Sequence, residues 1–181
     1  MKRSPSSLLL ALAFLAGSVL GGCATTPAQA PDSARVRVDW TDPQRFADVR
    51  ENPAPSPARK NPEEWLQPLA RWLQYRADQV LPAGDQLKVT FTDIKRAGAY
   101  EPWRGPQWMD VRIVKDIYPP RIDLRFTLTD ASGKTLDQGE RKLTDLAFLS
   151  RGTINNDDPL RYEKRMLDDW LRKEFATKSM R

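Results

Sequence analysis

Residues 121–129, RIDLRFTLT, decide how this chain folds. Every second side chain in this stretch is apolar, and the residues between them are charged or polar. The apolar set is Ile122, Leu124, Phe126 and Leu128. Alternation with a period of two is typical of a β-strand that buries one face against a core.

The residues after this strand predict a hairpin. Asp130-Ala131-Ser132-Gly133 is a turn sequence, and Gly133 suits a positive φ. Residues 135–143 then return as the antiparallel partner. Charges of both signs are expected to face each other across the hairpin, with the register open by one residue around Gly139: Arg125 and Asp123 against Glu140 and Lys142.

Three further stretches predict strands upstream of the hairpin. Residues 35–40 (RVRVDW) and 86–94 (QLKVTFTDI) alternate in the same way. Residues 110–118 place Val111, Ile113 and Ile117 on one parity, before Pro119-Pro120 interrupts the chain. The sequence therefore predicts about five strands.

Two segments predict helices. Asn61 can cap a helix that starts at Pro62, and apolar residues including Trp65 and Trp72 follow at helical spacing, which favours a packing role for both tryptophans. A second helix follows Pro159. The order β-α-β-β-β-β-α predicts an α+β fold: a mostly antiparallel sheet with the two main helices on one face. We expect one domain over residues 35–181.

The N-terminus is typical of an export signal. Residues 1–22 contain Lys2 and Arg3, then an apolar run that is too short for a membrane span of roughly 20 residues. The run ends in Leu20-Gly21-Gly22-Cys23, which resembles the lipobox of bacterial lipoproteins. This predicts cleavage before Cys23, lipid attachment to its sulfur and a tether over residues 24–34. The alternative is an ordinary cleaved signal with an incidental cysteine.

The lipoprotein prediction also implies a location in the cell. Lipid chains on Cys23 would bind the protein to a membrane. Residue 24 is alanine, whereas aspartate at that position favours retention in the inner membrane of Gram-negative bacteria. We therefore expect the protein in the bacterial cell envelope, on the outer membrane and facing the periplasm.

Composition excludes several kinds of chemistry. The chain has no histidine and one cysteine, so it can form neither a Ser-His-Asp triad nor an internal disulfide. The paired acids at 157–158 and 168–169 are interpreted as a helix cap and a solvated helix face, and no glycine-rich phosphate loop is present. No metal or cofactor is expected. The net charge of +5 is a mild excess and predicts no nucleic-acid partner.

One loop has the composition of a binding surface. Residues 96–109 (RAGAYEPWRGPQWM) place Tyr100, Trp103, Arg104 and Trp108 among prolines and glycines. Aromatic and arginine side chains are frequent anchors at interfaces. The alternative is that the tryptophans fold back and cover the edge of the sheet.

Long motifs carry a family resemblance. They are VTFTDI at 89–94, EPWRGP at 101–106, DVRIVKDIYPPRIDLRF at 110–126, GERKLTDLAFL at 139–149 and DPLRYEK at 158–164. With VRVDWTDPQRFADVR at 36–50, they resemble the proteobacterial domain-of-unknown-function family 3016. The resemblance implies a small exported protein or lipoprotein and assigns no activity or catalytic residue.

These observations favour a tethered interaction or accessory module of the envelope, without catalysis. Its expected partners, besides the membrane, are another envelope protein or a cell-wall component. The alternative is a carboxylate-dependent hydrolase, or a binding protein, that acts on cell-wall glycan, because paired carboxylates need neither histidine nor thiol.

Overall fold

The computed structural model describes residues 35–52, 61–152 and 157–176. The predicted signal peptide, the lipid site at Cys23 and the tether over residues 24–34 lie outside these ranges. Within them, four strands form the main sheet: β1 (Val36–Trp40), β2 (Gln86–Lys95), β5 (Arg121–Thr129) and β6 (Thr135–Thr144).

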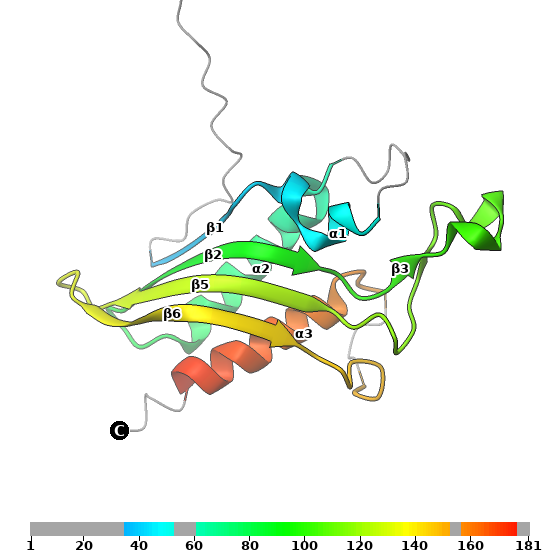
Figure 1. Ribbon diagram of the computed structural model, residues 1–181. Coiled ribbons are helices and arrows are strands. Elements are labelled where there is room, and N and C mark those ends of the chain that lie inside the picture. The colour runs from blue at the N-terminus through cyan, green and yellow to red at the C-terminus, as the bar shows by residue number, and fades with distance from the viewer. Residues whose placement is uncertain (1–34, 53–60, 153–156, 177–181) are drawn as a thin grey trace, which may run out of the picture.

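The sheet has the order β1-β2-β5-β6 and is mostly antiparallel. β1 runs parallel to β2, whereas β2 with β5 and β5 with β6 are antiparallel. Two long helices, α2 (Glu63–Val80) and α3 (Arg161–Leu171), lie side by side on one face of the sheet (Figure 1). The α+β class and the mostly antiparallel sheet are confirmed.

The predicted hairpin is present, and the register that the sequence left open by one residue is set by the pairing of Gly139 with Phe126. Gly133 has φ of 84°, and Asp130 Oδ1 accepts hydrogen bonds from the backbone N–H groups of Ser132 and Lys134. Across the two strands the charges alternate as expected, with Asp123 opposite Lys142 and Arg125 opposite Glu140.

The prediction of about five strands in one sheet was wrong for residues 110–118. Only Arg112–Ile113 (β4) is extended there, and it pairs with Ala99–Tyr100 (β3) in a separate two-stranded ribbon. Val111 and Ile117, which the sequence places on one parity of a strand, are 41% and 66% exposed. Asp116 turns the chain by accepting a hydrogen bond from the N–H of Ile117, and two prolines follow, so the alternation is too short to extend the sheet.

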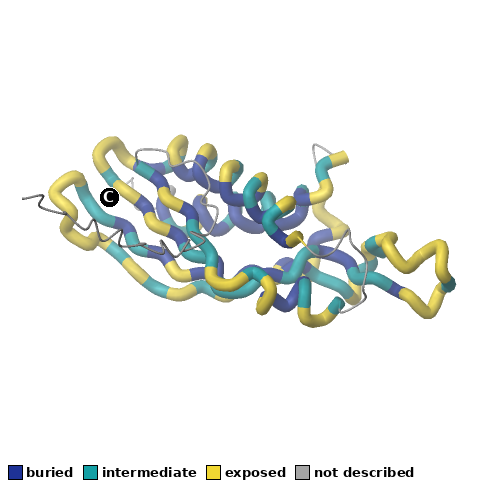
Figure 2. Tube along the Cα trace, turned by 90° about the horizontal axis from the view of Figure 1, so that it is seen from above, coloured by how far each residue is buried: buried dark blue, intermediate teal, exposed yellow. Residues whose placement is uncertain are grey.

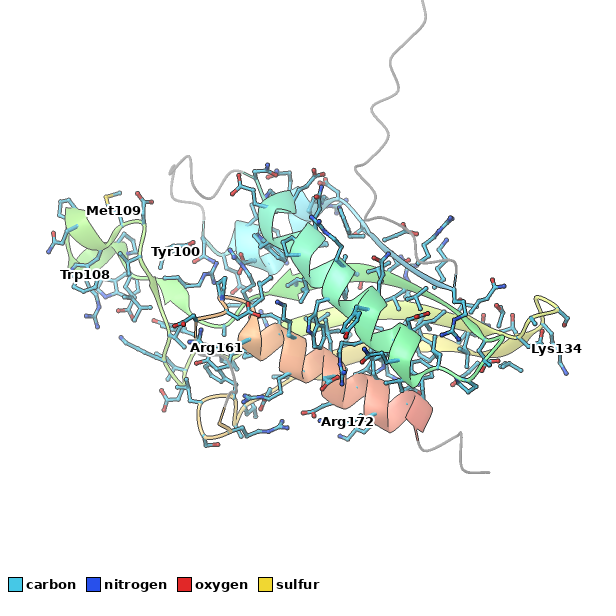
Figure 3. All side chains as sticks on the ribbon, turned by 180° about the vertical axis from the view of Figure 1, so that it is seen from behind. Tyr100, Trp108, Met109, Lys134, Arg161 and Arg172 are labelled. Carbon is cyan, nitrogen blue, oxygen red and sulfur yellow. The ribbon has the colours of Figure 1, made fainter. Side chains whose placement is uncertain are left out.

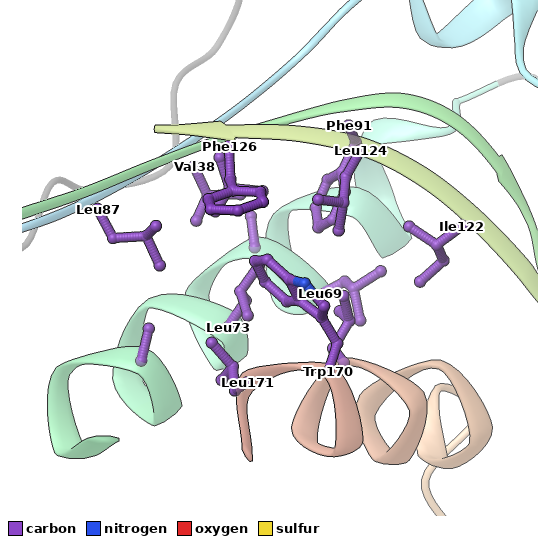
Figure 4. Close-up of a cluster of buried hydrophobic side chains, with 14 of the residues drawn as sticks. Val38, Leu69, Leu73, Leu87, Phe91, Ile122, Leu124, Phe126, Trp170 and Leu171 are labelled. Carbon is purple, nitrogen blue, oxygen red and sulfur yellow. The ribbon is translucent and has the colours of Figure 1, made fainter. Parts of the chain in front are cut away.

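The core lies between the sheet and the two long helices, where buried residues concentrate (Figure 2). Trp170 of α3 packs edge-to-face on Phe126 of β5, with ring centroids 5.8 Å apart (Figure 4). Phe175 lies 5.7 Å from the same phenylalanine. These aromatic contacts fix α3 against the middle of the sheet.

The helix α2 begins where the sequence indicated. Asn61 Oδ1 accepts a hydrogen bond from the N–H of Glu63 at 3.1 Å, which satisfies one of the free donors of the first turn. A short helix, α1 (Ala47–Arg50), precedes α2 and was not predicted. It contacts β2 and places Asp48 beside the end of that strand.

Candidate functional site

The loop that was predicted to bind forms the end of an arm. The arm consists of the β3–β4 ribbon and two single-turn 3-10 helices, η3 (Pro102–Arg104) and η4 (Pro106–Trp108), and it projects from one end of the sheet (Figure 1). Each turn begins with a proline, whose fixed φ suits that position. Gly105 joins the two turns with φ of 119°, a value that other residues rarely adopt.

The four residues of the predicted binding loop, Tyr100, Trp103, Arg104 and Trp108, lie at different positions along the arm. Trp103 is 73% exposed and Trp108 is 38% exposed, so Trp103 does not cover the edge of the sheet. Trp108 and Met109 lie near the tip of the arm, whereas Tyr100 lies close to its root (Figure 3). Arg104 Nε donates a hydrogen bond to the carboxylate of Glu101.

Glu101 fastens the root of the arm. Its side chain is 1% exposed and accepts hydrogen bonds from Lys115 Nζ at 2.6 Å, from Tyr118 Oη at 3.0 Å and from Arg104 Nε. The hydrogen bond from Lys115, joined by those from Arg104 and Tyr118, lowers the pKa of Glu101 to about 2 against its burial. The ionised carboxylate therefore ties both sides of the arm together.

A pocket of about 260 Å³ lies at the root of the arm, and the sequence did not predict it. Asp48, whose side chain is 3% exposed, is one of its lining residues. Arg96, at the end of β2, donates to Asp48 through its backbone N–H, Nε and Nη2. Arg112, from β4, donates to the same carboxylate through Nη2 at 3.0 Å. One buried anion therefore holds two guanidinium groups.

Each guanidinium also lies over an aromatic ring. The Cζ atom of Arg96 is 4.6 Å from the ring centroid of Trp65, and that of Arg112 is 4.7 Å from the ring centroid of Tyr100. Trp65 packs against the core as expected, and it also lines this pocket. The remaining lining residues are Val49, Asn52, Asn61 and Glu64.

Glu163 of α3 is a second buried acid beside this cluster. It is fully buried, and its Oε1 accepts a hydrogen bond from the N–H of Ala97 at 2.7 Å, next to Arg96. Its Oε2 has no hydrogen-bond partner among the described residues. Burial raises the pKa of Glu163, because the charged form is poorly solvated there.

The carboxylate of Asp48 is engaged within the protein. Both oxygens of Asp48 are taken by arginine donors, so this carboxylate is not free to act as an acid or base on a ligand. Within the described ranges, no three acidic, histidine or cysteine side chains gather in a way that could hold a metal ion.

None of the described helices is both long and apolar enough to cross a membrane.

Comparison with models of protein families gives a match that covers most of the chain. The family described as protein of unknown function (DUF3016) matches residues 34–173. No curated protein and no solved structure matches the chain. The matched region runs from just before β1 into the last turns after α3 and so contains the arm, the pocket and the whole sheet.

Proposed function

The chain belongs to the DUF3016 family of proteins of unknown function, and from this premise we propose that it is an envelope lipoprotein that serves as a tethered interaction module without catalysis. In this proposal residues 1–22 are the signal peptide, Cys23 carries the lipid, residues 24–34 are the tether and residues 35–181 form the domain. The proposed place is the periplasmic side of the outer membrane.

The N-terminal sequence supports the anchor. The single cysteine of the chain follows Leu20-Gly21-Gly22 at the end of a charged and then apolar segment. Each buried methylene of an attached lipid contributes about 0.8 kcal/mol to membrane binding, so several chains would hold the protein on the bilayer. A tether of small and polar residues would leave the domain free to reach a partner.

The arm supports the interaction role. The observation that carries this proposal is that Trp103 is exposed on an arm that is held in place by the hydrogen bonds of Glu101. At 73% exposure its indole contributes little to the core, while Glu101 fixes the segment from which it projects. Tryptophan on a rigid loop loses little conformational freedom on binding. We propose that the partner is another envelope protein with an apolar pocket that accepts Trp103.

Lipid attachment is tested by metabolic labelling with a fatty-acid analogue. The wild-type chain is expected to take up the label, and Cys23→Ser is expected to lose it and to appear in the soluble periplasmic fraction. Equal labelling of the two chains would contradict the anchor. An unlabelled wild type would favour an ordinary cleaved signal.

The arm is tested by placing a photo-crosslinking amino acid at position 103 in cells. We expect one discrete adduct with one envelope protein, and we expect Trp108→Ala to weaken the same adduct. A crosslinker at Leu146, which is 78% exposed and lies outside the arm, is the matched control and should not give that adduct. Adducts of equal yield at both positions, or an adduct with lipid alone, would contradict a protein partner at the arm.

A further inference from the structure

We propose that the pocket at the root of the arm binds a small zwitterion: an amino acid, or a short peptide that carries both its ammonium and its carboxylate group. This inference goes beyond the proposed function, because it depends neither on the lipid anchor nor on the tip of the arm. Donor groups, charge and size each contribute to it.

The arginines offer preformed donors for a carboxylate. Arg96 uses Nε and Nη2 to hold Asp48, and Arg112 uses Nη2 for Asp48 and Nη1 for the carbonyl of Gly98. Nη1 of Arg96 and Nε of Arg112 have no hydrogen bond to any described residue. Because both guanidiniums are stacked on aromatic rings and are 19% and 17% exposed, these donors are held in place before a ligand arrives.

Glu64 adds an acceptor of opposite charge on the same pocket. It lies in the first turn of α2, is exposed, and makes no ion pair or hydrogen bond through its side chain with a described residue. A ligand ammonium group that reaches Glu64 would satisfy this carboxylate.

The charges of the pocket favour a ligand that is neutral overall but has separated charges. Two guanidiniums and two carboxylates line the pocket, the buried Asp48 and the exposed Glu64. A dianion such as phosphate would gain from the arginines but would be repelled by both acids. A neutral sugar would leave the free arginine donors without an ionic partner.

The size of the pocket agrees with this class. About 260 Å³ is below the range of roughly 300–1,000 Å³ that is usual for drug-sized ligands, so an amino acid or dipeptide fits better than a glycan chain. Val49 and Trp65 supply an apolar wall for a small side chain. Asn52 and Asn61 line the same space. Asn61 Oδ1 caps α2, and Asn52 bonds to the backbone of Asp48 and Tyr100, so the Nδ2 group of Asn61 is the amide donor that can bond to a peptide group.

The first test measures binding of alanyl-alanine to the purified full-length chain by isothermal titration calorimetry. We expect the free dipeptide to bind, and its N-acetyl and its C-terminal amide forms each to bind about tenfold more weakly or worse, because each loses one charged hydrogen bond. Inorganic phosphate and glucose are the competing probes. Tighter binding of either probe than of the dipeptide, or no dipeptide binding at all, would overturn the proposal.

The second test changes the pocket without disturbing the buried cluster. Glu64→Gln removes an exposed charge and should weaken the dipeptide about tenfold while leaving the N-acetyl form unaffected. Glu63→Gln is the matched control, since Glu63 shares the first turn of α2 but does not line the pocket. Equal effects of the two variants would show that general charge, and not contact with the ligand, determines affinity, and would overturn the proposal.

Discussion

Arg96 encloses Asp48 with three hydrogen bonds: its backbone N–H reaches Oδ1 at 3.0 Å, and Nε and Nη2 reach Oδ2 at 3.0 and 2.9 Å. This pair joins α1 to the end of β2. Arg112 binds the same Oδ2 from β4 and so ties in the root of the arm. A single buried carboxylate therefore positions three separate segments of the chain around the pocket.

We expect Asp48→Ala to lower the free energy of unfolding by about 3–5 kcal/mol, because the substitution leaves two guanidiniums without their buried partner. Urea denaturation measures the change. Asp78→Ala is the control: Asp78 pairs with Arg35 where the side chains are 47% and 31% exposed, and its loss should cost only about 0–1 kcal/mol. Similar losses in the two variants would contradict the structural role of Asp48.

Truncation of two tryptophans should change the free energy of unfolding by very different amounts. Trp103→Ala should change the free energy of unfolding by less than about 0.5 kcal/mol, because the indole is 73% exposed. Trp170→Ala should cost about 3–5 kcal/mol, because its ring is 4% exposed and packs on Phe126. Chemical denaturation of the two variants under the same conditions compares them. A loss of several kcal/mol in Trp103→Ala would show that the arm packs against the body.

The sequence predicted the hairpin because the information for it is local. Alternation in residues 121–129 and the glycine at 133 need no knowledge of distant parts of the chain, whereas the register, which the sequence left open by one residue around Gly139, is given only by the structure. The same reasoning failed at residues 110–118, where only Arg112–Ile113 is extended. An alternating stretch predicts a strand in the main sheet only when its apolar side chains have a core to reach, and those of the arm do not.

The arm could be predicted from local sequence, whereas the pocket could not. Trp103 and Trp108 stand close together in a sequence of distinctive composition, so the loop could be singled out. Asp48, Arg96 and Arg112 are far apart in the chain, and each is an ordinary charged residue in its local context. They meet only because α1 packs on β2 and because Arg112 of β4 reaches the carboxylate of Asp48. Three lining residues did stand out in the sequence, but for other reasons: Trp65 for its helical spacing, Asn61 as a helix cap and Tyr100 as part of the predicted binding loop.

Glu163 should make stability fall as the pH rises. Burial raises its pKa above the usual glutamate value of 4.5, so the folded state holds this proton more tightly than the unfolded state. The stabilisation is complete below about pH 4.5 and is lost as the pH rises through the folded-state value. Unfolding free energies across this range should decline more steeply in the wild type than in Glu163→Gln, which cannot titrate. Parallel pH profiles for the two proteins would contradict the prediction.

Glu101 should show the opposite dependence at the root of the arm. Its pKa is lowered from 4.5 to about 2, so the ionised form stabilises the fold above about pH 4.5, and this contribution is lost as the pH falls toward 2. An NMR titration of its carboxyl carbon should give a midpoint near 2. Because the hydrogen bond from Lys115 is the largest cause, Lys115→Gln should raise that midpoint, whereas Lys142→Gln, on the exposed strand β6, should leave it unchanged. A wild-type midpoint near 4.5 would mean that the three donors do not hold the carboxylate in solution, and the arm would then lack the fixed root on which its proposed role depends.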